Sequence, residues 1–321
     1  MTLLMDRRWE GPHGIGRFAA EIAQRLPHES LPLAGRPLDL WDPLRLKTAL
    51  SRHPQALFLS PGFNPPLGRP CPFFLTLHDL IHLSSPIRRL WYDGLIRPAL
   101  KRADGVFTVS EFSKRRILEW SGLEPHQITV VGNGVSNVFT PEGPTYQAPR
   151  PYFLAVGNPK PHKNLEALIR AFVRSGLGKD RDLRLTGPSS PELLRRLSDS
   201  KLQNGIHFEG RVTELQLAAL YRGAIALVLP SRMEGFGLPL IEAMASGTAV
   251  IASDRGALPE IGGNACRYVD PDREESLVEA LRAFVDPTVR APFVALGLVR
   301  AKDFHWDGVA ARIQQGLKAV R

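Results

Sequence analysis

Short apolar runs alternate along the chain with longer segments of helical periodicity, and this alternation constrains the fold more than any other feature. The pattern is typical of βα units whose strands form a parallel sheet. In the first half, strands are expected at residues 2–5, 56–60, 73–77, 105–109 and 128–131. In the second half, they are expected at residues 152–156, 183–186, 206–209, 224–229 and 249–252. The sequence therefore predicts an α/β protein with two parallel sheets.

A proline-rich segment, residues 140–151, separates the two groups of expected strands. Its four prolines and one glycine cannot continue a helix or a central strand. We therefore expect an N-terminal domain at residues 1–148 and a C-terminal domain at 149–302, in keeping with a length of 321 residues. Residues 303–321 are expected to form a helix that packs back on the N-terminal domain through Phe304, Trp306, Val309, Ile313 and Leu317.

Charge and cysteine content narrow the range of partners and compartments. The formal net charge of +9 favours anionic partners, which include nucleotides, phospholipid surfaces and nucleic acid. Cys71 and Cys266 are too few for a disulfide framework or a cysteine-based zinc site, which favours a reducing compartment. The chain has no apolar run of about 18 residues and only a short one at its start, so neither a membrane span nor a signal peptide is expected. A cytoplasmic protein is the expectation.

The most informative motif lies in residues 230–254, which follow an expected strand. Gly235 and Gly237 allow the backbone to turn sharply and approach a ligand closely. Pro239 suits the first turn of a helix, and Gly247 suits the end of that helix. The amides of the first helical turn, together with the helix dipole, favour a phosphate or sugar hydroxyls at this point.

Three charged side chains accompany the two glycines. Glu234 lies in the loop and Glu242 one turn into the helix, so both could accept hydrogen bonds from sugar hydroxyls. In the earlier loop 156–165, Lys163 offers a positive charge to a leaving diphosphate. Each of the three could instead be an ordinary exposed or helix-start residue.

The segment Glu-Gly-Phe-Gly-Leu-Pro-Leu-Ile-Glu, residues 234–242, holds two glutamates separated by seven residues. It resembles the hallmark motif of the retaining GT-B glycosyltransferases of the family-four type. The resemblance implies two Rossmann-like domains that face a central cleft. It also implies that a hexose is transferred from a nucleotide sugar with retention of configuration, and without a metal or another cofactor. The leading donor is GDP-mannose, and the expected acceptor is a glycan or a lipid-linked oligosaccharide.

The resemblance also assigns site residues. It implies catalytic roles for His78, which follows the expected strand 73–77, and for Lys163 and Glu234. The family usually has a second basic residue near Lys163, where this chain has Asn158 and His162, so Lys160, Arg232 or a protonated His162 would make the second phosphate contact. The residues expected to bind the donor are Gly14, Gly16, Arg17, Asn158, His162, Lys163, Arg211, Val212, Glu234, Gly235, Phe236, Gly237, Leu238 and Glu242.

Other functions stay open at this point. Gly14 and Gly16, just before a helix expected at residues 18–26, and Ala19 at the start of that helix fit a loose dinucleotide fingerprint, which would suit a nicotinamide-dependent oxidoreductase. A nucleotide-sugar epimerase or a sugar phosphorylase would share the fold. A basic protein that binds nucleic acid or carbohydrate without catalysis would explain the charge but not the glutamate pair, and no nucleic-acid partner is expected.

The segment 86–116 carries eight lysines and arginines against three acidic residues, with Trp91, Tyr92 and Leu95 between them. Such a surface could rest on anionic lipid headgroups, as a peripheral protein on the inner face of the plasma membrane. It could equally be a solvated helix face. Two local features are expected to be structural: Ser110 as a helix N-cap, and Asn133–Gly134 as a turn with positive φ.

Overall fold

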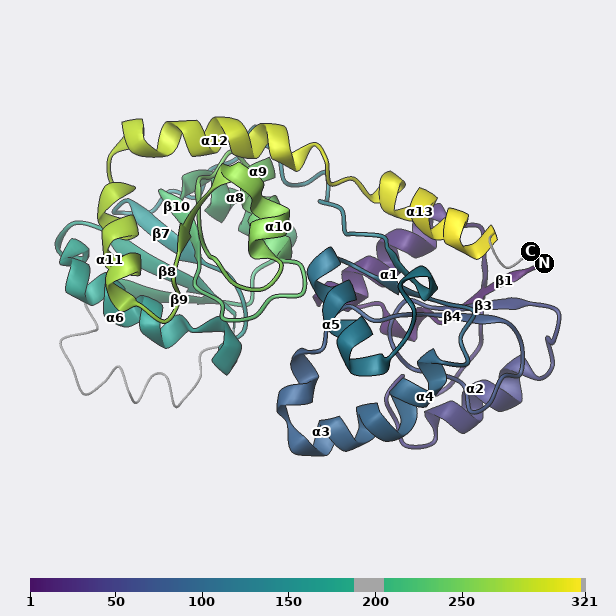
Figure 1. Ribbon diagram of the computed structural model, residues 1–321. Coiled ribbons are helices and arrows are strands. Elements are labelled where there is room, and N and C mark those ends of the chain that lie inside the picture. Colours follow the sequence, from purple (N-terminus) through teal and green to yellow (C-terminus); the bar gives the residue numbers. More distant parts are fainter. Residues whose placement is uncertain (188–204, 319–321) are drawn as a thin grey trace. The chain divides into compact units, whose positions relative to one another are not determined.

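The structure is a computed structural model that describes residues 1–187 and 205–318 (Figure 1). The chain forms two compact units. The first unit consists of Met1–Gly134 and His305–Arg321, and the second unit consists of Val135–Phe304. Among the helices within the described ranges, none has the length and apolar character needed to cross a membrane.

The first unit contains a six-stranded parallel sheet with the strand order β2-β1-β3-β4-β5-β6. Three of these strands, β3, β4 and β5, are short, mainly apolar runs in which every residue is buried, as expected for a sheet covered on both faces. Their bounds are β1 Leu3–Met5, β2 Glu29–Ser30, β3 Leu57–Ser60, β4 Phe73–Thr76, β5 Gly105–Thr108 and β6 Ile128–Val130.

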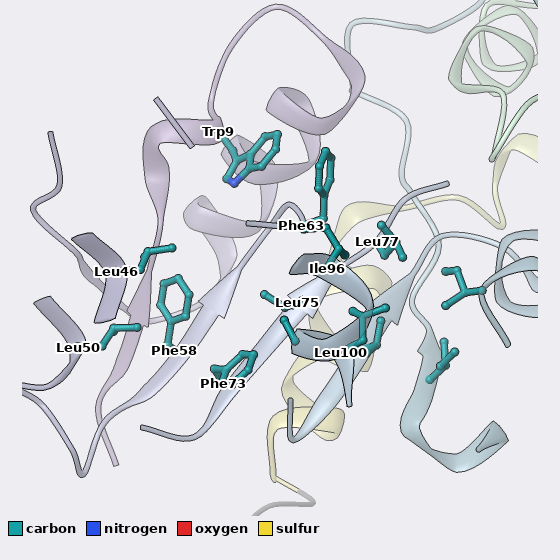
Figure 2. Close-up of a cluster of buried hydrophobic side chains, with 14 of the residues drawn as sticks. Trp9, Leu46, Leu50, Phe58, Phe63, Phe73, Leu75, Leu77, Ile96 and Leu100 are labelled. Carbon is teal, nitrogen blue, oxygen red and sulfur yellow. The ribbon is translucent and has the colours of Figure 1, made fainter. Parts of the chain in front are cut away.

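Helices cover both faces of this sheet. On one face, Leu46 and Leu50 of α2 and Leu100 of α4 join Phe58 and Phe73 in one core cluster (Figure 2). On the other face, α1 and α13 build a second cluster around Phe74 and Phe107. The α-helices are α1 Gly14–Arg25, α2 Asp42–Leu50, α3 Pro86–Trp91, α4 Arg97–Leu100, α5 Glu111–Ser121 and α13 Trp306–Lys318; the shorter turns are η1 Arg7–Trp9, η2 Ile81–Ser84, the π-helical η3 Tyr92–Ile96 and η4 Pro125–Gln127.

The second unit also contains a six-stranded parallel sheet, with the order β12-β11-β10-β7-β8-β9. Read from the other edge, this is the strand order of a Rossmann dinucleotide-binding sheet, in which the strand order reverses between the parallel neighbours β7 and β10. The bounds are β7 Tyr152–Ala155, β8 Asp182–Thr186, β9 Ile206–Gly210, β10 Ala226–Leu229, β11 Val250–Ser253 and β12 Cys266–Val269.

The helices of the second unit lie on both faces of its sheet. Helices α6 and α11 enclose one core cluster with Phe153 of β7. The neighbouring side chain, Tyr152, points to the opposite face and donates a hydrogen bond to the carbonyl of Leu220 in α8 at 2.7 Å. The helices are α6 Leu165–Ser175, α8 Glu214–Gly223, α9 Leu238–Ala245, α10 Leu258–Gly262, α11 Glu274–Ala283 and α12 Pro287–Ala301; the 3₁₀ turns are η5 Pro161–Lys163, η6 Leu177–Lys179 and η8 Gly263–Ala265.

All ten strands expected from the sequence are present, so the α/β class with two parallel sheets is confirmed. Two edge strands, β2 and β12, were not predicted. Helix α1 begins at Gly14 rather than at residue 18, because His13 caps it: His13 Nδ1 accepts a hydrogen bond from the amide of Gly16 at 2.9 Å. The glycines of this segment therefore lie inside the first helical turn.

The division between the units lies between residues 134 and 135, whereas proline content placed the domain boundary near residue 148. The proline-rich segment belongs to the second unit because Arg222 in α8 donates hydrogen bonds to the carbonyls of Thr140 and Pro144. At the other end, Phe304 packs edge to face on Phe236 in the second unit. Helix α13 starts after it, and α13 packs on α1. Residues 319–321 of the expected C-terminal helix lie outside the described residues.

The two local features give one confirmation and one correction. Ser110 caps α5, since its Oγ accepts a hydrogen bond from the amide of Ser113 at 3.0 Å. The turn at Asn133–Gly134 was wrong, because the positive φ in this stretch is that of Gly132, at 76°. Gly134 is needed for a different reason: a Cβ there would lie 2.5 Å from the backbone nitrogen of Trp306.

Candidate active site

The loops that follow β7 and β10 leave the same carboxyl edge of the second sheet, at the one place where its strand order reverses. Ligands of open α/β sheets bind at such a reversal. The loop after β7 carries Lys163 and the loop after β10 carries Glu234. Lys163 Nζ donates a hydrogen bond to Glu234 Oε1 at 2.7 Å. The structure thus joins two of the site residues expected from the sequence, although they lie 71 positions apart in the chain.

Glu234 is held from several directions. Ser231 Oγ donates a second hydrogen bond to Glu234 Oε1, at 2.7 Å, and Ser253 Oγ in turn donates to the carbonyl of Ser231. The carbonyl of Glu234 accepts from the amide of Ala257 at 3.0 Å. Gly256 fits against the same backbone, where a Cβ would lie 2.7 Å from the nitrogen of Glu234. The carboxylate, in a residue that is 7% exposed, is therefore fixed in place before any ligand arrives.

The loop of Lys163 is equally well anchored. Lys163 ends the turn η5, and the carbonyl of His162 in that turn accepts a hydrogen bond from the amide of Arg232 at 2.8 Å. Asn164, in the left-handed conformation with φ of 55°, donates from its side chain to the carbonyl of Pro271 at 2.8 Å. These bonds tie the loop after β7 to the loops after β10 and β12.

Glu242 has a different set of neighbours from Glu234. It lies in α9, is buried, and accepts a hydrogen bond from Tyr221 Oη at 3.0 Å. Gly237, with φ of 98°, forms the N-cap of α9, and Pro239 stands in the first turn as expected. Gly247 follows the end of the helix with φ of 73°, which confirms its expected role.

The remaining donor-binding candidates of the second unit lie along the same edge of its sheet. Gly235, Phe236 and Leu238 belong to the loop and start of α9, and Asn158 lies in the loop after β7, where its carbonyl accepts from the amide of Lys160 at 2.7 Å. Arg211 and Val212 directly follow β9, which is the edge strand next to β8. Within residues 1–187 and 205–318, no three His, Cys, Asp or Glu side chains gather closely enough to hold a metal ion.

His78 follows β4 at the carboxyl edge of the first sheet and is 9% exposed. Its Nε2 lies 2.9 Å from the carbonyl of Pro61. Because a carbonyl only accepts hydrogen bonds, Nε2 carries the proton and Nδ1 is left as the acceptor of the neutral ring. Burial lowers the pKa of His78 below its usual value, so the neutral form is favoured.

The glycine motif of the first unit starts α1. Gly16 is required by packing, since a Cβ there would lie 2.3 Å from the carbonyl oxygen of Gly11. Gly14, Gly16 and Arg17 all lie in the first turn of α1, which follows β1 at the carboxyl edge. After burial, the charge of a protonated His13 also contributes to lowering the pKa of His78, so the cap of α1 lies within electrostatic reach of the catalytic candidate.

Sequence reasoning missed several residues that hold the site. Tyr221 and Ser253, which support Glu242 and the Glu234 loop, come from other elements and carry no local signal. It also missed a buried ion network in the first unit, where Arg8 pairs with Asp6 at 2.7 Å and with Asp42 at 2.6 Å. A signal was available there, because Asp6 directly follows the first strand.

Two family models match the chain, and together they cover most of both units. The model described as "Glycosyltransferase Family 4" matches residues 8–137, and the model described as "Glycosyl transferases group 1" matches residues 150–286.

Curated relatives have the same kind of description. The chain is 32% identical over 214 residues to the O-antigen chain mannosyltransferase RfbU of Salmonella typhimurium, an alignment that covers 65% of this chain and 59% of the relative. It is 28% identical over 307 residues to O-antigen chain mannosyltransferase B of Escherichia coli, covering 88% and 79%. It is 31% identical over 241 residues to the MMP alpha-(1->4)-mannosyltransferase of Mycolicibacterium hassiacum, covering 71% and 57%. The chain thus matches less than two thirds of the first and third of these proteins.

Solved structures share the whole fold. A sucrose-phosphate synthase from Thermosynechococcus elongatus superposes with a TM-score of 0.75 at 20% identity, covering 100% of this chain and 99% of that one. WaaG, a glycosyltransferase involved in lipopolysaccharide biosynthesis, superposes with a TM-score of 0.75 at 14% identity, covering 98% of both chains. With two parallel sheets, a carboxylate motif at the reversal point and matches to both family models, the chain belongs to the family-four, group 1 glycosyltransferases of the GT-B fold.

Proposed function

We propose that this protein is a retaining, metal-independent hexosyltransferase that takes its sugar from a nucleotide sugar, with GDP-mannose as the leading donor. The observation that carries the proposal is the contact between Lys163 Nζ and Glu234 Oε1 at the reversal point of the second sheet. This contact places a cation and a carboxylate side by side where α/β sheets bind nucleotides. A nucleotide sugar needs both, since its diphosphate is anionic and its hexose offers hydroxyl donors.

The proposed chemistry assigns one task to each group. As the bond between the anomeric carbon and the diphosphate oxygen breaks, negative charge grows on the leaving group, and Lys163 together with the N-terminus of α9 stabilises it. Glu234 accepts a hydrogen bond from the hexose, and Glu242 one from the ribose. The acceptor hydroxyl bonds to the anomeric carbon on the face that the diphosphate leaves, and its proton passes to a phosphate oxygen. His78 is the proposed catalytic residue of the first unit.

Donor and acceptor are proposed from the relatives. The three relatives described above are named as mannosyltransferases, which supports mannose and hence GDP-mannose. Two of them are named for the O-antigen chain, which supports a glycan or lipid-linked glycan acceptor. An acceptor of this kind is consistent with a cytoplasmic protein that associates peripherally with the inner face of the plasma membrane.

A thermal-shift panel of GDP-, UDP-, ADP- and dTDP-sugars tests the proposal first, because a ligand that binds only the folded state stabilises the protein more, at equal concentration, the more tightly it binds. We expect GDP-mannose to give the largest shift. Transfer to an acceptor, followed by NMR of the new anomeric centre, then tests retention. The proposal fails if no nucleotide sugar stabilises the protein. A shift with NAD alone would indicate an oxidoreductase, and donor turnover without an acceptor would indicate an epimerase.

Metal independence has its own test. We expect the transfer rate to be unchanged by excess EDTA, because the proposed charge stabilisation comes from Lys163 and from backbone amides. A rate that falls with EDTA and returns with added Mg²⁺ or Mn²⁺ would contradict this part of the proposal.

A further inference from the structure

Two short segments of the first unit expose large apolar side chains to solvent. In the described part of the chain, the large apolar side chains that are more than 60% exposed are Ile87 81%, Leu90 76%, Leu40 74%, Leu215 73%, Val299 66% and Trp41 63%. Leu40 and Trp41 are consecutive, and Ile87 and Leu90 lie three residues apart on α3 and so share one helix face. Single exposed apolar residues are common, but pairs of this kind need an explanation.

Both segments belong to the same helical layer. Helix α2 starts directly after Trp41, and α3 leads through η3 into α4. Side chains of α2, η3 and α4 pack in one core cluster on one face of the sheet. The exposed pairs therefore lie on the outer side of this layer, opposite the sheet.

Both segments also lie at the carboxyl edge of the sheet. Asp42, the first residue of α2, accepts hydrogen bonds from Arg8 at 2.6 Å and from Asn64 at 2.8 Å. Arg8 follows β1 and Asn64 follows β3, so α2 begins at that edge. Helix α3 follows β4 after the turn η2, and His78 lies in the same connection. The exposed apolar pairs are thus on the side of the layer nearest the proposed catalytic residue of this unit.

The charges around these pairs are positive. Residues 86–102 contain five lysines and arginines against one carboxylate, that of Asp93. Arg88 and Arg89 stand between Ile87 and Leu90, and both are exposed. Near the other pair, Arg36 and Lys47 are exposed, the carboxylate of Asp39 is paired with Arg45 at 2.9 Å, and Asp42 is buried. Exposed aliphatic residues and a tryptophan, flanked by arginines, are the composition of a surface that inserts into a bilayer interface.

We propose that this apolar–basic surface, formed by Leu40, Trp41, Ile87, Arg88, Arg89 and Leu90, docks the first unit on a bilayer that contains anionic lipid. The inference rests on the proposed lipid-linked acceptor and specifies how the enzyme reaches it. The arginines bind the headgroup phosphates, and the four apolar side chains enter the boundary between headgroups and acyl chains. Docking in this way brings the carboxyl edge, with His78, close to the membrane surface.

Vesicle flotation with the full-length protein tests the surface. We expect the protein to float with phosphatidylcholine vesicles that contain about 30% phosphatidylglycerol, and far less with phosphatidylcholine alone. Ile87→Ser/Leu90→Ser should lower the partition coefficient by about 100-fold, since each lost side chain is worth about tenfold. Arg88→Gln/Arg89→Gln should lower it by about 30-fold.

Matched controls come from the second unit. Leu215→Ser removes a leucine of similar exposure in α8, and Arg170→Gln/Arg174→Gln removes two exposed arginines of α6. Both control variants should float like the unaltered protein. Equal flotation of the Ile87→Ser/Leu90→Ser variant and the Leu215→Ser variant would overturn the proposal. It would also be overturned if sedimentation showed a dimer that this double substitution abolishes while flotation stays unchanged, since the surface would then bind a second copy.

Tryptophan fluorescence gives a second measurement that is independent of activity. Of the five tryptophans, Trp41 is exposed, Trp91 and Trp120 are half-buried, and Trp9 and Trp306 are buried. Brominated phosphatidylglycerol should quench the emission of the unaltered protein, and Trp41→Phe should remove much of that quenching. Equal quenching in both proteins would contradict insertion of the Leu40–Trp41 pair.

The membrane inference and the proposed function can fail separately. The docking variants should keep the thermal shift with GDP-mannose and the transfer rate to a water-soluble acceptor. If no protein in the set responds to any nucleotide sugar, the proposed function fails whatever the vesicles show. If the nucleotide responses are present and flotation does not depend on the apolar–basic surface, only the docking inference fails.

Discussion

Replacing Lys163 by methionine removes the ammonium group and keeps most of the side-chain volume. Glu234 then loses the hydrogen bond at 2.7 Å and keeps the one from Ser231. Breaking a fully buried ion pair costs about 3–5 kcal/mol. The side chains of this pair are 19% and 10% exposed, so water screens part of the effect and we expect a loss of about 1–3 kcal/mol in unfolding free energy.

The reciprocal change, Glu234→Gln, should destabilise less, because the flexible lysine can turn its charge toward water. The double variant leaves no unpaired charge, so its stability should return close to that of the unaltered protein. Activity should behave differently: each single substitution should lower the transfer rate by about 100-fold or more, and the double variant should not recover it.

Urea denaturation and initial transfer rates at saturating donor measure the two effects on the same samples. Lys179→Met, which removes an exposed lysine elsewhere in the second unit, is the control and should change neither quantity. Near-normal transfer by both single variants would refute the catalytic assignment. Recovery of activity together with stability in the double variant would show that the pair is structural only.

Two further outcomes follow from glycine packing and from histidine burial. Gly256→Ala should destabilise the protein and lower the transfer rate, because the new Cβ would lie 2.7 Å from the backbone nitrogen of Glu234 and would move that residue. Gly176→Ala is the control: it has a similar positive φ but open space around it, so it should cost only about 1 kcal/mol of stability and leave the transfer rate unchanged. Equal effects of the two variants on the transfer rate would contradict this reasoning. Burial lowers the pKa of His78 below its unfolded-state value of 6.5, so the stability that its neutral form contributes is complete above pH 6.5 and is lost as the pH falls toward the folded-state pKa. In urea denaturation, the difference in unfolding free energy between about pH 7.5 and about pH 5.5 should therefore be smaller for His78→Gln than for the unaltered protein. An unchanged difference would contradict the lowered pKa.

The parts of the fold that sequence reasoning found are those with strong local patterns. Buried central strands such as β7 and β10 are apolar runs of four residues, a length that suits a buried strand and is too short for a helix. The strands it missed lie at sheet edges. Strand β2 has only the exposed residues Glu29 and Ser30, and β12 is interrupted by the exposed Arg267. These two edge strands leave no clear apolar pattern, whereas the other two edge strands, β6 and β9, hold enough apolar residues to be found.

The candidate site shows the same limit. The spacing of the glutamates and glycines located the loop of Glu234, and the strand order brings that loop beside Lys163. The side chains that hold it, such as Tyr221 against Glu242, are set by tertiary packing alone. The start of α1 was misplaced for a local reason, because His13 is outside the usual set of N-cap residues.

Helix α13 completes the core of the first unit, where Trp306, Val309 and Ile313 cover Phe18 and Ile22 of α1. During synthesis these residues leave the ribosome only after the whole second unit has been made. The usual order, in which the N-terminal domain folds first, is therefore reversed here. The nascent first half must wait with this face of its sheet covered by α1 alone, and a chain stopped before residue 306 would present the remaining apolar side chains to chaperones and proteases.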